Sequence, residues 1–188
     1  FFADTGAGTM GDPDSSLRFA PSWFDVAPPV TTPPATVRDR RGCDTFPIDA
    51  NDPDQALRLL SFVWPDQSER FVRTREAIAI ARSHPPLVDT ASADEWVRIQ
   101  LSGGISAATV VFHSIVWQYL GRRVQDGLRE ALNEAGAVAT RECPLYWIRM
   151  EPAGPVANVR ATEWSGNEPV ETLLCEIGYH GRDMRWLA

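Results

Sequence analysis

The sequence contains no lysine, and all 18 basic residues among its 188 residues are arginines. This absence excludes enzymes that form a Schiff base through lysine, and it excludes a phosphate-binding loop of the glycine-lysine type. The 18 arginines stand against 25 acidic residues, which leaves a net charge of −7. Because a negative field repels polyanions, we expect neither nucleic acid nor an anionic membrane surface as the main partner.

Cysteine and histidine are also scarce. The three cysteines, Cys43, Cys143 and Cys175, show no CxxC spacing, which is typical of reduced thiols in a cytoplasmic protein. The three histidines occur singly, so we expect no metal site. No apolar run is long enough to cross a bilayer, and we expect no membrane-spanning segment. The sequence opens on Phe1 without an initiator methionine, which indicates a piece of a longer chain.

The composition changes along the chain and predicts three segments. Residues 1–51 hold seven of the 15 prolines and predict a loop-rich arm with one strand near residues 17–24. Residues 52–103 carry helical patterns, in which Asp52-Pro53 suits the start of one helix and Asp66 is expected to cap the next. Residues 104–188 alternate strand and helix patterns and predict an α/β portion of one domain.

The α/β portion begins with a continuous run of β-branched and aromatic residues, Ala108 to Phe112. Such a run is typical of a parallel strand buried on both faces. A helical pattern follows, with Gly136 in the position of a C-terminal glycine, and a second apolar strand spans Leu145 to Ile148. These elements predict a βαβ unit. Alternating stretches at 156–164 and 171–177 predict an antiparallel hairpin, and residues 182–187 a short edge strand.

Gly6-Ala-Gly8-Thr-Met-Gly11 matches the GxGxxG pattern of cofactor-binding loops. That loop requires a strand before it and a helix after it, because the helix N-terminus faces the bound ligand. Only five residues precede Gly6, and prolines follow closely. An ordinary turn is therefore favoured over a cofactor loop.

His113 and Glu151 follow the ends of the two apolar strands. Because ligands of open parallel sheets bind beyond the carboxyl ends of the strands, we expect both side chains to face one crevice. A histidine and a partly desolvated carboxylate can transfer a proton, so both are candidate catalytic residues. The structural alternative is that His113 caps the next helix or bonds a backbone carbonyl, and that Glu151 pairs with Arg149 or Arg160.

Six further residues are candidates for binding substrate. Trp117 and Tyr119 follow the first strand and could form the wall of a pocket, although core packing is the alternative. His180 lies between two glycines in a turn, where exposure to solvent is the alternative. Arg40, Asp44 and Asp49 belong to a proline-bounded polar loop that either crosses an active site or forms a salt-bridged surface.

Several motifs together resemble the uncharacterised bacterial family called domain of unknown function 2332, over nearly the whole chain. The run Leu57 to Gln67, which ends Phe-Val-Trp-Pro-Asp-Gln, is the most specific of them. The others include Gly11-Asp-Pro13, Ser16-Leu-Arg18, Asp39-Arg40-Arg41-Gly42, Phe112-His-Ser114, Trp117-Gln-Tyr119, Arg149-Met-Glu-Pro152 and Gly178-Tyr-His-Gly181.

The resemblance implies an α/β fold with a Rossmann-like, class I methyltransferase-like sheet, of which this chain forms the C-terminal part. The proline-rich arm and an inserted helical segment would accompany that sheet. The resemblance also implies that a missing N-terminal segment of the same chain holds the glycine-rich loop, and that Ser114 lies beside S-adenosylmethionine. The acceptor would be a small molecule or a protein side chain. A non-catalytic binding or assembly domain that kept the fold is the alternative.

Overall fold

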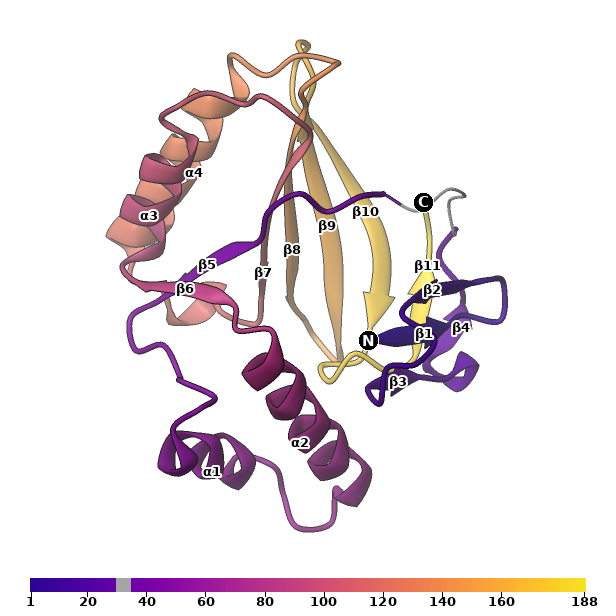
Figure 1. Cartoon of the computed structure of the whole chain (residues 1–188). Helices are drawn as coiled ribbons and strands as arrows, with labels where there is room; N and C mark the ends of the chain where they lie inside the picture. Colours follow the sequence, from indigo (N-terminus) through magenta and orange to yellow (C-terminus); the bar gives the residue numbers. More distant parts are fainter. Residues whose placement is uncertain (30–34) are drawn as a thin grey trace. The chain divides into compact units, whose positions relative to one another are not determined.

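A computed structural model describes residues 1–29 and 35–188 and divides the chain into two compact units. The first unit comprises Phe1–Pro21 and Pro29–Ala91, and the second comprises Ser22–Pro28 and Ser92–Ala188. A short 3-10 turn, η1 (Pro21–Trp23), joins them in the sequence. Figure 1 labels the helices and strands of both units.

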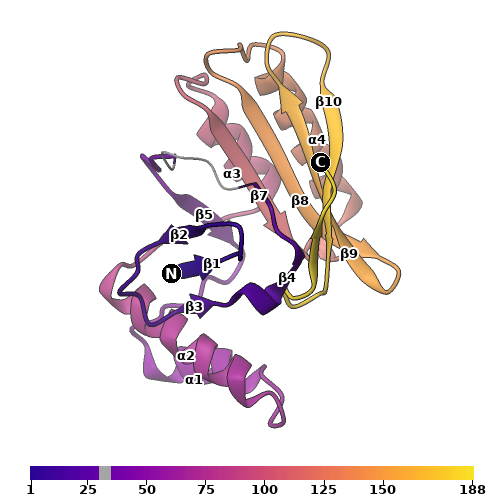
Figure 2. The same ribbon diagram turned by 90° about the vertical axis from the view of Figure 1, so that its right-hand side faces the viewer.

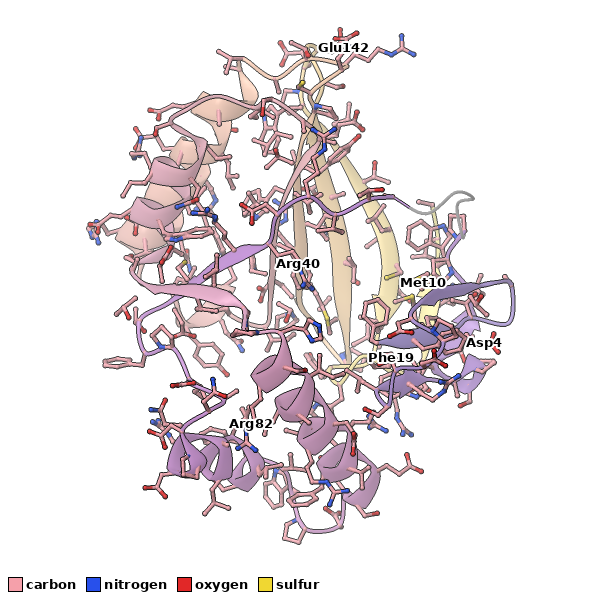
Figure 3. All side chains as sticks on the ribbon, viewed as in Figure 1. Asp4, Met10, Phe19, Arg40, Arg82 and Glu142 are labelled. Atoms are coloured by element: carbon pink, nitrogen blue, oxygen red, sulfur yellow. The ribbon has the colours of Figure 1, made fainter. Side chains whose placement is uncertain are left out.

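The first unit begins with a small three-stranded sheet of β1 (Phe2–Asp4), β2 (Thr9–Gly11) and β3 (Arg18–Phe19). Strand β1 is central, antiparallel to β2 and parallel to β3. Asp4, Met10 and Phe19, which are labelled in Figure 3, lie on these three strands. The GxGxxG stretch is thus a hairpin, and the prediction of a single strand in this region, near residues 17–24, was wrong. Gly11 has φ +87°, and a side chain there would meet the Phe1 carbonyl.

The rest of the first unit contains α1 (Pro53–Ser61), α2 (Ser68–Ser83) and a parallel pair, β5 (Arg41–Asp44) with β6 (Leu87–Thr90). Asp52 caps α1 as predicted, since its carboxylate accepts the backbone N–H groups of Asp54 and Gln55. The prediction for α2 was wrong, because Gln67 rather than Asp66 precedes its first turn. The Gln67 carbonyl accepts the first helical hydrogen bond, which the backbone N–H of Phe71 donates.

The second unit is built on a six-stranded mixed sheet in the order β4-β11-β10-β9-β8-β7. Its strands are β4 (Phe24–Val26), β7 (Thr109–Ser114), β8 (Leu145–Ala153), β9 (Val156–Trp164), β10 (Val170–Ile177) and β11 (Met184–Trp186). Strands β7 and β8 are parallel, β8 to β11 form an antiparallel meander, and β4 runs parallel to β11. The predicted βαβ unit and hairpin are therefore present in a mixed α/β fold.

Two helices, α3 (Ala93–Leu101) and α4 (Arg122–Gly136), lie side by side along one face of this sheet (Figures 1 and 2). Val97, Leu128, Leu132, Leu145 and Trp164 belong to the core between helices and sheet. A 3-10 turn, η2 (Trp117–Tyr119), connects β7 to α4.

Gly136 is the last residue of α4, and the prediction that it follows the helix as a terminating glycine was wrong. A Cβ atom at this position would lie 2.4 Å from ring atoms of Trp164. Glycine is present because it lets the helix approach the indole closely.

Strand β7 is not buried on both faces, contrary to the prediction from its composition. It pairs with β8 alone among the described residues, and its burial alternates along the strand. Val110 and Phe112 are 54% and 61% exposed, whereas Val111 packs against the core.

None of the helices in the described part of the chain combines the length and the apolar character needed to cross a membrane.

Candidate functional site

The pairing of β7 with β8 brings His113 and Glu151 together. His113 lies opposite Arg149 in the parallel register, and Glu151 lies two residues further along β8. Side chains two residues apart point to the same face of a sheet, so Glu151 shares the face of His113. The His113 Nδ1 and Glu151 Oε1 atoms are 2.7 Å apart, which is a hydrogen bond between two largely buried side chains. The predicted pair is therefore in contact.

The same carboxylate oxygen anchors the chain after β7. Glu151 Oε1 accepts the backbone N–H groups of Val116 and Trp117, each at 3.2 Å. Between them and His113, Ile115 has φ +50°, an uncommon conformation for a β-branched residue. Its N–H donates to the Met150 carbonyl at 2.8 Å. These contacts position η2, and the strained residue lies two positions after the histidine.

Two tryptophans complete what we call the histidine–carboxylate cluster, which consists of His113, Glu151, Trp117 and Trp147. The Trp117 ring stacks on His113 with centroids 5.6 Å apart and an interplanar angle of 16°. The Trp147 centroid is 5.9 Å from that of His113 and 5.6 Å from that of Trp117. The imidazole is thus held between aromatic surfaces and a carboxylate.

Two arginines flank the cluster. The guanidinium of Arg129 lies 4.6 Å from the Trp117 ring centroid, and that of Arg149 lies 4.1 Å from the Trp147 centroid. Such contacts stabilise a cation over an aromatic face. Arg149 and Arg160 both pair with Glu171 rather than with Glu151, so the structural alternative for the Glu151 carboxylate is wrong.

Three buried polar atoms of the cluster have no hydrogen-bond partner among the described residues. They are His113 Nε2, Trp147 Nε1 and Glu151 Oε2. Buried polar groups in folded proteins are almost always hydrogen-bonded, because an unmet donor or acceptor is costly. Their occurrence in one cluster marks it as a place where a further polar group would be stabilised.

The hydrogen bonds around Glu151 assign the histidine tautomer. Two backbone N–H groups donate to Oε1, so this oxygen acts as an acceptor, and His113 Nδ1 is the third donor to it. Burial lowers the pKa of His113 below its ordinary value of 6.5, although Glu151 opposes that change. The neutral imidazole therefore carries its proton on Nδ1, and Nε2 carries the lone pair.

The other predicted residues of this unit do not join the cluster. Ser114 is exposed at the end of β7, and Tyr119 is 75% exposed on η2. His180 is exposed in the turn after β10, near the same end of the sheet. Strands β8 and β9 lie between β10 and β7, so His180 follows a strand that is not adjacent to that of His113.

Arg40, Asp44 and Asp49 belong to the first unit, where all three are exposed (Arg40 is labelled in Figure 3). The Asp44 carboxylate accepts the Phe46 N–H, and the Asp49 carboxylate accepts the Asn51 N–H, each at 2.8 Å. These bonds form local turns of the loop.

Within the described residues, no group of three His, Cys, Asp or Glu side chains could hold a metal ion.

The sequence pattern did not single out Trp147 or Arg129, and it named Arg149 only as a structural partner of Glu151. A signal for two of them was present, because Trp147 and Arg149 precede Glu151 by four and two residues. Alternation along β8 therefore places them on the face of the catalytic candidates. Arg129 lies on α4 and reaches Trp117 only through the tertiary fold.

No curated protein matches the chain, and no solved structure does. A family model described as "Uncharacterized protein conserved in bacteria (DUF2332)" matches residues 1–186. Because the match spans nearly the whole sequence, the chain belongs to the DUF2332 family of uncharacterised bacterial proteins.

Proposed function

We propose that His113 is a general base that Glu151 orients, and that the cluster removes a proton from the acceptor of a methyltransferase-like reaction. The observation that carries the proposal is the buried His113 Nε2 without a partner among the described residues, while Nδ1 is bonded to Glu151. Neutral imidazole accepts a proton efficiently near its own pKa. The imidazolium that forms is stabilised by the adjacent carboxylate, as in other histidine–carboxylate pairs.

The methyltransferase-like part of the proposal rests on the resemblance of the chain and on the βαβ unit that precedes the hairpin. S-adenosylmethionine is the methyl donor that such a fold binds. The described residues fit that donor poorly, because the GxGxxG stretch is a hairpin and Ser114 is the remaining candidate at the strand end. We therefore assign only the proton transfer to this chain's residues.

The acceptor is a small molecule or a protein side chain, and the free cysteines favour a cytoplasmic location.

Calorimetric titration of the full protein with S-adenosylmethionine and S-adenosylhomocysteine tests the methyl donor. Binding of either ligand supports methyl transfer, and absence of heat and of a thermal shift at millimolar ligand overturns that part.

The proton transfer is tested separately by His113→Gln and the matched variant His84→Gln, whose histidine is exposed in the first unit. We expect methyl transfer, measured as formation of S-adenosylhomocysteine, to be lost in His113→Gln and kept in His84→Gln. Equal activity of both variants contradicts the role of His113.

A non-catalytic binding domain is the second candidate, and the three hydrogen bonds that Glu151 Oε1 accepts favour it. In that case the cluster holds η2 in place and performs no chemistry. Unfolding of His113→Ala and Glu151→Gln, followed by circular dichroism, supports this candidate. Retention of the fold with loss of activity supports the general base.

A further inference from the structure

The indole N–H of Trp147 is a buried donor that the proton transfer does not use. The Trp147 residue is only 6% exposed, and its Nε1 has no acceptor in the part of the chain that the structure describes. A buried indole usually donates its N–H to a partner, and leaving a donor unmet costs about 1–3 kcal/mol. Trp186 differs, because its Nε1 donates to the Ala188 carbonyl. The unmet donor of Trp147 therefore points to an acceptor beyond the described residues.

We propose that Trp147 Nε1 and His113 Nε2 bind one hydroxyl oxygen, so that the acceptor of this site is an alcohol or a phenol rather than an amine. The inference rests on the function proposed above and names its substrate class. A hydroxyl group complements both nitrogens, because it donates its proton to Nε2 and accepts the indole N–H. The two rings belong to one cluster, with centroids 5.9 Å apart, so the two unmet nitrogens lie in the same buried region.

The number of lone pairs separates oxygen from nitrogen. A hydroxyl oxygen has two lone pairs, so one accepts the Trp147 N–H while the other stays free to attack an electrophile. A neutral amine has one lone pair, and a hydrogen bond from Trp147 would occupy it. During proton transfer the O–H bond breaks, its proton joins Nε2, and the electron pair stays on oxygen. Trp147 then stabilises the charge that develops there.

The surroundings favour a hydroxyl on an apolar, flat group. Trp117 and Trp147 present aromatic surfaces beside the imidazole. The remaining unmet atom, Glu151 Oε2, does not compete for the substrate hydroxyl. Glu151 binds at His113 Nδ1, and Nε2 lies on the opposite side of the imidazole ring. One hydroxyl therefore meets both the donor Trp147 Nε1 and the acceptor His113 Nε2.

Phenol and aniline are isosteric probes that differ in the atom concerned. Nuclear magnetic resonance of the full protein follows the indole N–H of Trp147, assigned with Trp147→Phe, and the ring nitrogens of His113. We expect phenol to shift both the Trp147 N–H and His113 Nε2, and aniline to shift Trp147 little, because the aniline lone pair is delocalised into its ring and is a weak acceptor. Trp147→Phe should weaken phenol binding about fivefold to tenfold and leave aniline binding unchanged.

The matched control is Trp186→Phe, which removes an indole whose N–H already has an acceptor and should leave both affinities unchanged. Equal shifts by phenol and aniline, a phenol response at His113 without one at Trp147, or no response to phenol overturns the hydroxyl assignment. The general base itself fails by a different result, a protonated His113 Nε2 in the protein without any probe.

Discussion

The two compact units differ in what they bury. The second unit packs Leu132, Leu145 and Cys175 with almost no exposed surface, and its cluster excludes polar atoms from solvent. Among the described residues of the first unit, the buried apolar side chains are Ala3, Ala56 and Ile78.

Large apolar side chains of the first unit instead line an open groove of about 720 Å³ between α1 and α2, which includes Leu57, Phe62, Trp64, Phe71 and Val72. The specific Phe-Val-Trp-Pro motif is therefore a surface feature, since Phe62 and Trp64 are exposed. The difference teaches that most hydrophobic stabilisation and the desolvated histidine–carboxylate cluster both belong to the second unit. Substitutions in the two units should consequently have very different effects.

Leu132→Ala should produce the largest loss of stability. Leu132 lies on α4, is 0% exposed and packs in the core, and removal of such a side chain costs about 2–5 kcal/mol. The matched change Leu57→Ala, at a residue 65% exposed in the first unit, should cost less than about 0.5 kcal/mol. Urea unfolding followed by circular dichroism measures both. Similar losses in the two variants would remove the distinction between the units.

Gly136→Ala should have the next largest effect. The added Cβ would lie 2.4 Å from the Trp164 ring, and overpacking of this kind costs about 1–3 kcal/mol. Gly103→Ala is the control, because no atom lies within 4 Å of a Cβ placed there. Thermal unfolding should show a lowered midpoint for Gly136→Ala alone. An unchanged midpoint would mean that the helix moves away from Trp164 without cost.

His113 should give the second unit a pH-dependent stability. Its pKa is lowered in the folded protein, so the unfolded chain binds the proton more readily, and stability falls as pH drops below 6.5. Above that value the contribution of His113 is constant. Denaturant midpoints between pH 8 and pH 5 should decline more in the native protein than in His113→Gln. Parallel pH profiles would show that the histidine is not desolvated.

Tyr119→Phe should have the smallest effect. Tyr119 is largely exposed on η2 and lies outside the histidine–carboxylate cluster, so its hydroxyl should change stability by less than about 0.5 kcal/mol. Activity, where methyl transfer is detected, should also be retained. A strong loss of activity in a folded variant would place Tyr119 in the site and enlarge the cluster toward solvent.

Much of the second unit was predictable because its signals are local. The spacing of the two apolar strands and the helix between them predicted the parallel pair, and parallel strand ends predicted the contact of His113 with Glu151. The position of β7 at the edge of the sheet was not predictable. A run of β-branched and aromatic residues is compatible with an edge strand as well as with a central strand.

Gly136 and Trp147 show where local signals end. A glycine at the end of a helix predicts a terminator, whereas the contact with Trp164 is long-range and invisible in the sequence. The unmet N–H of Trp147 is likewise a property of the packed cluster, because hydrogen-bond satisfaction depends on atoms from several elements. Both required the tertiary structure.

The protonation state of His113 tests the central claim most directly. Long-range ¹H–¹⁵N correlation spectra of the full protein at pH 7.5, assigned with His113→Gln, distinguish a protonated ring nitrogen from an unprotonated one. We predict a neutral ring with the proton on Nδ1 and a free Nε2. A proton on Nε2, in either the neutral or the charged ring, would contradict the assignment of His113 as the general base.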